Sequence, residues 1–250
     1  LSLSEGSEKG WHNFIVKGLM LFAALMLAVF IIIERRQKHP LLDFQMFSSR
    51  IFTASVASAY LNYVASAAVN FLLPFFLVQA CGFGESKAGM VMMAAPIAMV
   101  LLTGPSGYLS DKIGVRLPAT LGMIFVVVGM FLLSRLHPGS VPLQIMPYTF
   151  IFGLGSGLFT SPNNSAIMGS APKNMKGVAG AILSAARTIG FASGVSLSAA
   201  IYVSRLHSLA STPKPVAVAS AMHTSLTVVA VIAGVGIFCS ALRGKAETED

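Results

Sequence analysis

The chain has 250 residues and a formal net charge of +8, and 55% of its residues are hydrophobic while only 10% are charged. A soluble domain usually carries about 25% charged residues, so this composition excludes an ordinary water-soluble fold. The basic residues are spread singly or in pairs between apolar runs, which is typical of topology signals in a membrane protein and argues against a nucleic-acid partner.

The apolar runs are each about 20 residues long, the length of a membrane-spanning helix. The chain lacks the strict alternation over about 10 residues that marks a transmembrane β-strand. We therefore expect an all-α polytopic bundle of about seven spans in a lipid bilayer. In chain order these spans are residues 14–33, 50–79, 87–109, 116–133, 143–168, 178–203 and 218–242.

The basic residues in the short connections predict the orientation of the bundle. More of them fall on the side that holds Arg35, Lys112 and Lys173 than on the side that holds Lys87 and Arg205. The richer side is expected to be cytoplasmic. In the plasma or inner membrane of the cell, the N-terminus would then lie outside and the C-terminus in the cytoplasm.

The turn between the third and fourth spans contains a pattern of glycine, acidic and basic residues. Glycine suits a tight turn, and an aspartate at a helix end can meet the positive N-terminal end of a neighbouring helix or pair with a nearby basic residue. Such contacts can hold one conformation and break in another. The candidates for a conformational gate are Gly107, Asp111, Lys112, Gly114 and Arg116.

The pattern Gly107-x-x-x-Asp111-Lys112-x-Gly114-x-Arg116 resembles the loop signature of the major facilitator superfamily, in the weaker copy of the C-terminal half. It lies between the second and third helices of the block that starts at residue 50, where that copy is expected. The block then has the six helices of one transporter half. Position 115 is valine where the signature often has a basic residue, which weakens the expected latch.

Three further segments resemble the fourteen-helix drug:proton antiporters of the QacA/EmrB type, which insert two helices between their halves. They are Glu34-Arg-x-x-x-His39-Pro40-Leu41-Leu42-Asp43, the segment 161–168, and Arg187-Thr-Ile-Gly190-x-x-x-Gly194. The likeness implies that residues 1–49 hold a polar lead, one linker helix and a cytoplasmic link. Residues 50–250 would form the C-terminal six-helix bundle with a short cytoplasmic tail. A missing N-terminal half is the expected partner.

Polar residues mark a candidate substrate cavity. Ser55, Ser58, Asn62, Ser66 and Asn70 recur every three or four residues on the second span and so share one stripe, for which helix packing and a central cavity are equal alternatives. Arg187 lies about ten residues into its span, near mid-membrane, where a charged side chain is energetically costly. Such an arginine marks a functional site, faces a water-filled cavity or forms a structural pair. The candidate lining is Asn62, Ser66, Asn70, Asn163, Asn164 and Arg187.

Small residues predict where helices pack closely. Gly153-x-x-x-Gly157 and Gly190-x-x-x-Gly194 each place two glycines on one helix face. Such faces let two helix backbones approach in a membrane. We expect packing, and no chemistry, at these positions.

The positions of the acidic residues bear on proton coupling. All nine fall in loops, termini or helix ends, although proton-driven transport usually runs through a membrane-buried carboxylate. The coupling carboxylates are therefore expected in the first half. The sequence has no metal-ligand cluster and no catalytic triad, so we predict a non-enzyme without cofactor or metal.

The leading hypothesis is multidrug or small-molecule efflux by proton antiport, with an amphipathic cation as one candidate substrate. A seven-helix receptor has the same predicted topology, but the last span has no mid-helix lysine to hold a retinal and the gate pattern would be unexplained. The other alternative is a non-transporting fragment that needs a partner half. The first residue is Leu1 and not methionine, so we expect the natural N-terminus to lie upstream.

Overall fold

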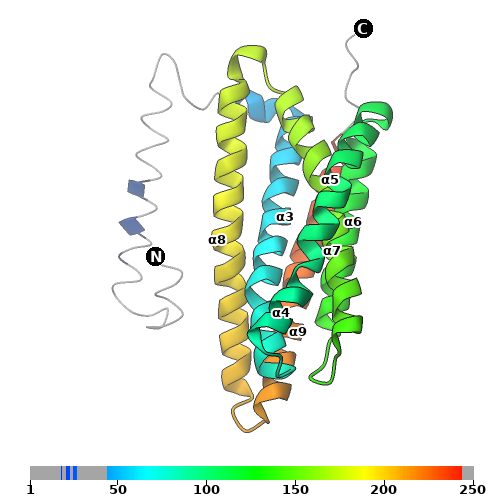
Figure 1. Ribbon diagram of the computed structural model, residues 1–250. Coiled ribbons are helices and arrows are strands. Elements are labelled where there is room, and N and C mark those ends of the chain that lie inside the picture. The colour runs from blue at the N-terminus through cyan, green and yellow to red at the C-terminus, as the bar shows by residue number, and fades with distance from the viewer. Residues whose placement is uncertain (1–17, 19–20, 23–24, 27–43, 244–250) are drawn as a thin grey trace. The chain divides into compact units, whose positions relative to one another are not determined.

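The computed structural model describes residues 18, 21–22, 25–26 and 44–243 (Figure 1). The chain divides into two units, Leu1–Met46 and Phe47–Asp250. Most of the predicted linker span 14–33 and of the cytoplasmic link lies outside the described residues, as does the tail after residue 243. The helical bundle described below belongs to the second unit.

The six predicted spans after residue 50 are all helical. The 3-10 helix η1 (Phe44–Ser48) precedes α3 (Arg50–Phe75), which continues as the π-helix η2 (Phe76–Ala80). The next span consists of two helices in sequence, α4 (Glu85–Met92) and α5 (Ala94–Ile113). They are followed by α6 (Arg116–Ser134), α7 (Pro142–Gly169), the 3-10 turn η3 (Lys173–Met175), α8 (Lys176–Ser208) and α9 (Lys214–Ala241).

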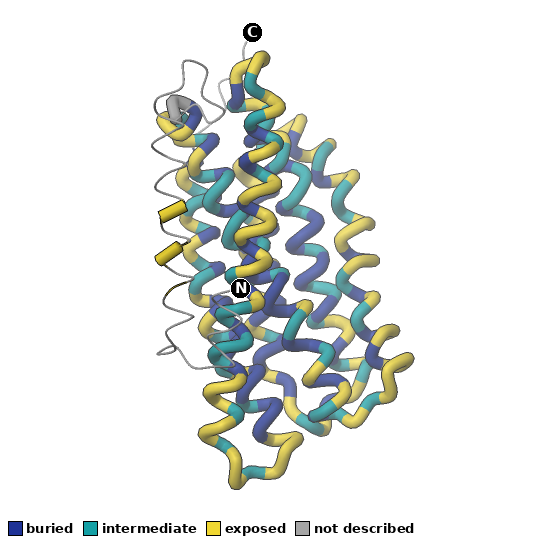
Figure 2. Tube along the Cα trace, turned by 90° about the vertical axis from the view of Figure 1, so that its left-hand side faces the viewer, coloured by how far each residue is buried: buried dark blue, intermediate teal, exposed yellow. Residues whose placement is uncertain are grey.

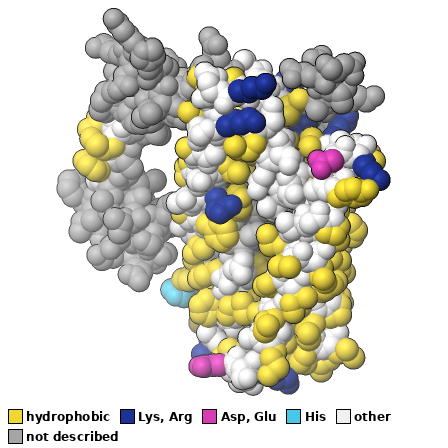
Figure 3. Space-filling view, turned by 45° about the horizontal axis from the view of Figure 1, so that its top comes forward, with side chains coloured by type: hydrophobic (Ala, Val, Ile, Leu, Met, Phe, Trp, Pro, Cys, Tyr) yellow, Lys and Arg dark blue, Asp and Glu magenta, His cyan; other side chains and the backbone are white. Residues whose placement is uncertain are grey.

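The bundle is built for a membrane. Within the described ranges, five spans are long and apolar enough to cross a bilayer, with α4 and α5 counted as one span. The exception is α7, which is rich in Gly, Ser, Thr and Asn and packs against both α5 and α6. Figure 3 shows hydrophobic side chains over much of the visible surface, with most charged side chains toward the ends. The expected all-α membrane bundle is therefore confirmed.

The helices form two groups of neighbours. In one group α7 packs against α5 and α6, and in the other α3 packs against α8 and α9. Contacts of α6 with α9 and of α3 with α7 join the two groups. Buried residues follow the inner sides of these helices, whereas α5 and α8 expose much of their length (Figure 2).

The span Glu85–Ile113 crosses the bundle as one helix, as predicted, with an interruption of a single residue at Met93. We expected one helix over residues 87–109. α4 ends at Met92 and α5 begins at Ala94, and Met93 between them keeps helical dihedral angles and accepts a hydrogen bond from the N–H of Ile97. Pro96 explains the interruption, because proline has no N–H to donate to the carbonyl of Met92. The interruption lies beside the cavity described below, to which Met92 and Pro96 both contribute.

Glycines set the distance between neighbouring helices. A Cβ atom on Gly155 would lie 2.5 Å from the backbone N of Val126 on α6, and one on Gly157 would lie 2.5 Å from the carbonyl O of Met99 on α5. A Cβ on Gly194 of α8 would likewise lie 2.6 Å from a carbonyl O of α3. The predicted packing faces on α7 and α8 are therefore confirmed, and α7 uses glycines on two sides.

Replacing Gly155 by alanine should destabilise the bundle. The new methyl group would overlap the backbone of α6, and overpacking of this kind costs about 1–3 kcal/mol. The matched control is Gly234→Ala on α9, where a Cβ would meet nothing within 4 Å. We expect a lower melting temperature in detergent for Gly155→Ala alone. Equal melting temperatures for both variants would contradict this account of the α6–α7 contact.

Candidate functional site

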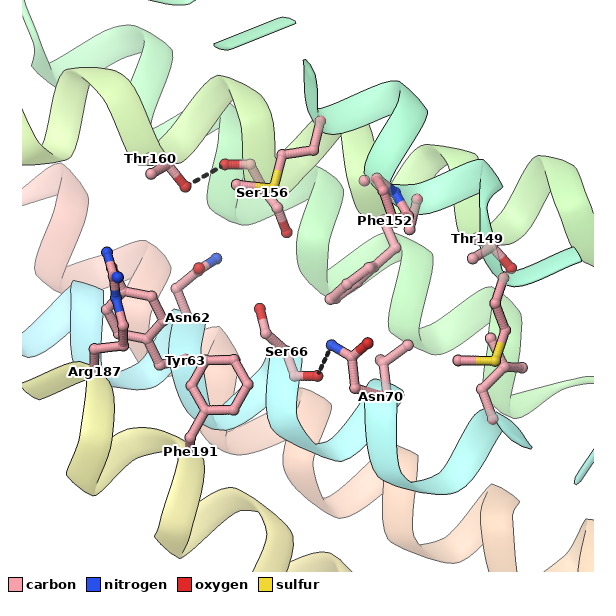
Figure 4. A pocket seen from close by; sticks show the side chains of 17 residues that line it. Asn62, Tyr63, Ser66, Asn70, Thr149, Phe152, Ser156, Thr160, Arg187 and Phe191 are labelled. Carbon is pink, nitrogen blue, oxygen red and sulfur yellow. Dashed lines mark hydrogen bonds between the residues drawn. The ribbon is translucent and has the colours of Figure 1, made fainter. Parts of the chain in front are cut away.

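A cavity of about 410 Å³ opens among α3, α4, α5, α7 and α8 (Figure 4). Its volume falls in the range of about 300–1,000 Å³ that is typical of small-molecule sites. Apolar side chains dominate, and a few polar groups converge among them, as such sites require. The polar lining is Asn62, Ser66, Asn70, Thr149, Ser156, Thr160 and Arg187.

The polar stripe on α3 contributes to helix packing at one end and to the cavity at the other. Ser58 and Asn62 are buried, Ser66 is half-buried and Asn70 is exposed. Asn62, Ser66 and Asn70 line the cavity, and the Asn70 side-chain amide donates to the Ser66 carbonyl at 2.7 Å. Ser55 and Ser58 instead lie within the packed bundle. Helix packing thus uses one end of the stripe, and the cavity uses the other.

The opposite wall comes from one face of α7. Thr149, Phe152, Ser156 and Thr160 are spaced three or four residues apart, so a single helix face presents them to the cavity. Thr149 and Thr160 donate to carbonyls of their own helix, at 2.9 Å and 2.7 Å. In the part of the chain that the structure describes, the buried Ser156 hydroxyl has no partner.

Arg187 is the one charged residue among the described residues that line the cavity. It lies about 16 Å along α8 from Lys176, at 1.5 Å per residue, which is about a third of the length of this helix; its position near mid-membrane stays a prediction. Its guanidinium carbon is 5.4 Å from the ring centroid of Tyr63, and the Tyr63 and Phe191 rings are 5.9 Å apart. Within the described residues, the guanidinium has no hydrogen bond and no ion pair. The ring of Tyr63 therefore supports a charge that remains available to a ligand.

Two predicted lining residues lie outside the cavity. Asn163 is buried, and its side-chain oxygen is 3.4 Å from the Ser58 hydroxyl. Asn164 is half-buried and does not line the cavity. The structure thus brings together four of the six predicted lining residues.

Arg243 belongs to the interior of the bundle. It directly follows the span predicted to end at residue 242 and was therefore expected in the cytoplasmic tail, but it is fully buried. Its guanidinium donates to the Ser58 hydroxyl and to the Asn163 side-chain oxygen, and it lies 5.8 Å from the Phe159 ring centroid. Burial lowers the pKa of this guanidinium to about 10, so it stays protonated at neutral pH. Arg243 therefore links the end of α9 to α3 and α7.

The gate candidates lie at the turn between α5 and α6. Gly114 joins the two helices with a φ of 84°, a backbone conformation that favours glycine, so the predicted glycine turn is confirmed. Asp111 is exposed and forms no ion pair with any described residue, and the Lys112 ammonium lies 4.6 Å from the Tyr108 ring. The latch formed by Gly107, Asp111, Lys112, Gly114 and Arg116 stays a prediction. Among the described residues there is also no cluster of His, Cys, Asp or Glu that could hold a metal ion.

The chain is similar in sequence to known membrane transporters. A protein-family model described as Major Facilitator Superfamily matches residues 7–195 and 55–245. The riboflavin transporter RibZ of Clostridioides difficile is 32% identical over 72% of this chain and 40% of its own length. The quinolone resistance protein NorB of Staphylococcus aureus is 28% identical over 80% of this chain and 43% of its own. The chain thus spans about two fifths of the curated relatives it matches.

A solved structure shows the same fold. The crystal structure of tetrameric PepTSo2 superposes with a TM-score of 0.65 at 18% sequence identity. The match covers 78% of this chain and 40% of that one. Similarity at this level of identity concerns the fold alone.

The division of the α3 stripe can be tested by cysteine labelling. In the full-length protein with all native cysteines replaced, Ser66→Cys should react with a water-soluble maleimide, because Ser66 lines the cavity. Ser58→Cys, at a fully buried position, should react far more slowly. The measurement is the labelling rate by gel shift, and comparable rates at the two positions would contradict the division.

Removing the Arg243 side chain should lower thermal stability. Arg243→Ala deprives Ser58 and Asn163 of a donor and leaves a void beside Phe159; hydrogen bonds to charged groups contribute about 1.5–3 kcal/mol each. The matched control is Arg205→Ala, at an exposed position near the end of α8. We expect a lower melting temperature for Arg243→Ala alone. An unchanged value would mean that this arginine does not stabilise the bundle.

Proposed function

Since the chain belongs to the Major Facilitator Superfamily, we propose that it is the C-terminal half of a transporter that exports small molecules by proton antiport. The cavity between α3, α7 and α8 is the observation that carries this proposal. Relatives named for riboflavin transport and for quinolone resistance support a small organic substrate. These relatives are named as transporters or resistance proteins, which supports a non-enzymatic role.

The partner in this proposal is an N-terminal half that closes the cavity from the other side. Transporters of this kind bind their substrate between two bundles near the middle of the membrane. The broad exposure of α5 and α8 supports such a partner, because both helices flank the cavity. Met99, which lines the cavity, and Ile189 are apolar examples of the surface that a second bundle would cover.

Proton coupling is assigned to the other half. The described residues that line the cavity include no carboxylate and no histidine. A proton carrier within the membrane is usually an acidic or histidine side chain. The transport cycle therefore requires titratable groups beyond this lining, which supports the expectation drawn from the nine acidic residues.

The turn at Gly114 is proposed as the cytoplasmic gate. The basic residues near it support an N-terminus outside and a C-terminus inside the cell membrane. In the proposed cycle, Asp111 forms its ionic contacts in one conformation and releases them in the other. Its exposure and its lack of an ion pair among described residues are compatible with the released state.

Transport can be measured directly with the full-length protein in proteoliposomes. The probes are riboflavin, a fluorescent quinolone and ethidium, each tested with an imposed pH gradient. We expect accumulation of at least one probe above protein-free vesicles, and its loss when a protonophore collapses the gradient. Failure to move any probe, or transport that is unaffected by the protonophore, would count against the proposed antiport.

Neutralising Asp111 tests the gate separately from binding. Asp111→Asn keeps the shape of the side chain but removes the charge, so we expect a several-fold slower transport rate with unchanged substrate affinity. Glu85→Gln is the matched control, because Glu85 is also exposed and begins α4 at the other end of the same span. Equal rates for the two variants, or a change in affinity with Asp111→Asn, would contradict a gating role.

A further inference from the structure

The charge of the cavity points to the chemical class of its substrate. Arg187 carries the one charge in the described lining, and its guanidinium has only a ring neighbour, Tyr63. Arg243 provides the contrast within the same bundle, because its guanidinium donates to Ser58 and Asn163. Arg187 is thus the charged group that a ligand in this cavity could reach, and an anion there would pair with its guanidinium.

The geometry of arginine favours a particular anion. A guanidinium presents two parallel N–H groups that match both oxygens of a carboxylate. The guanidinium carbon of Arg187 lies 5.4 Å from the Tyr63 ring centroid, and this contact with a ring face does not occupy the N–H donors. In Figure 4 the Arg187 side chain extends along the cavity wall that α3 and α8 form. A carboxylate in the cavity could therefore be bound by two hydrogen bonds.

The remaining walls suit a planar ring. Phe191 follows Arg187 by one turn of α8, and Phe152 projects into the cavity from α7 on the opposite side (Figure 4). Aromatic side chains of this kind contact a flat aromatic ligand in stacked or edge-on geometry. Asn62, Ser66 and Asn70 of α3 add polar groups to the same cavity. Ring contacts and one anion contact are thus available within a single cavity.

We propose that the cavity binds a planar aromatic carboxylate, with Arg187 on the carboxylate and Phe152 and Phe191 on the ring. This inference rests on the proposed transport function and specifies its substrate. It replaces the amphipathic cation considered from the sequence, because the positive charge of Arg187 would repel a cation in the cavity.

A charge series on one ring system tests the proposal. The probes are anthracene carboxylate, its carboxamide and the corresponding aminomethyl cation, titrated by fluorescence into the full-length protein in lipid nanodiscs. We expect the carboxylate to bind most tightly and the cation most weakly. Arg187→Gln should raise the Kd of the carboxylate by about tenfold or more, and should change that of the carboxamide by less than about twofold.

Two further variants separate the roles of charge and ring. Arg187→Lys keeps the charge but loses the two parallel donors, so we expect a Kd for the carboxylate between those of the native protein and Arg187→Gln. Phe152→Leu should weaken all three probes to a similar extent. Because the Arg187 side chain is exposed, its replacements should keep the native melting temperature. The Lys variant still tests the role of the donors if the Gln variant fails to fold.

Several results would overturn the proposal. One is an equal Kd for the carboxylate in the native protein and Arg187→Gln, and another is tightest binding of the cation. If Arg187 instead pairs with a carboxylate of the N-terminal half, Arg187→Gln should strengthen cation binding and leave the anthracene carboxylate unaffected. Transport of other probes without this charge preference would refute the substrate class alone. Selective carboxylate binding without any transport would refute the function and leave the site intact.

Discussion

Helices in a bilayer cannot be held together by burying apolar side chains, because the lipid tails are equally apolar, so close backbone contact must replace that force. In this bundle α7 supplies much of the contact, with Gly155 against α6 and Gly157 against α5. Glycines on two sides leave a further face of the helix for larger and polar groups. Phe152 and Ser156 on that face reach the cavity. The packing of the bundle and the shape of the candidate site therefore depend on the same helix.

Most of the bundle could be predicted because a bilayer fixes the length of each span. The span expected at residues 116–133 is α6, Arg116–Ser134, and the other ends differ by a few residues. The one-residue interruption at Met93 within the predicted span could not be read from the sequence, since membrane helices often tolerate proline. Its consequence depends on the neighbours that surround the freed carbonyl. Those neighbours are a property of the tertiary structure.

The candidate site was partly predictable for a similar reason. Helical spacing placed Asn62, Ser66 and Asn70 on one face, and the cost of a charge in the membrane singled out Arg187. Spacing within one helix does not show which other helix lies opposite. Asn163 was therefore assigned to the cavity, although it contacts Ser58. Phe152 was missed because an aromatic residue on a membrane helix more often faces lipid or packs.

The burial of Arg243 has a practical consequence for working with the protein. This residue follows the last turn of α9 and looks dispensable in the sequence, yet it belongs to the interior of the bundle. A truncation that stops at Ala241 would keep every membrane-spanning helix and still remove a core side chain. Affinity tags and fluorescent fusions therefore belong after residue 243, joined by a linker that leaves this arginine in place.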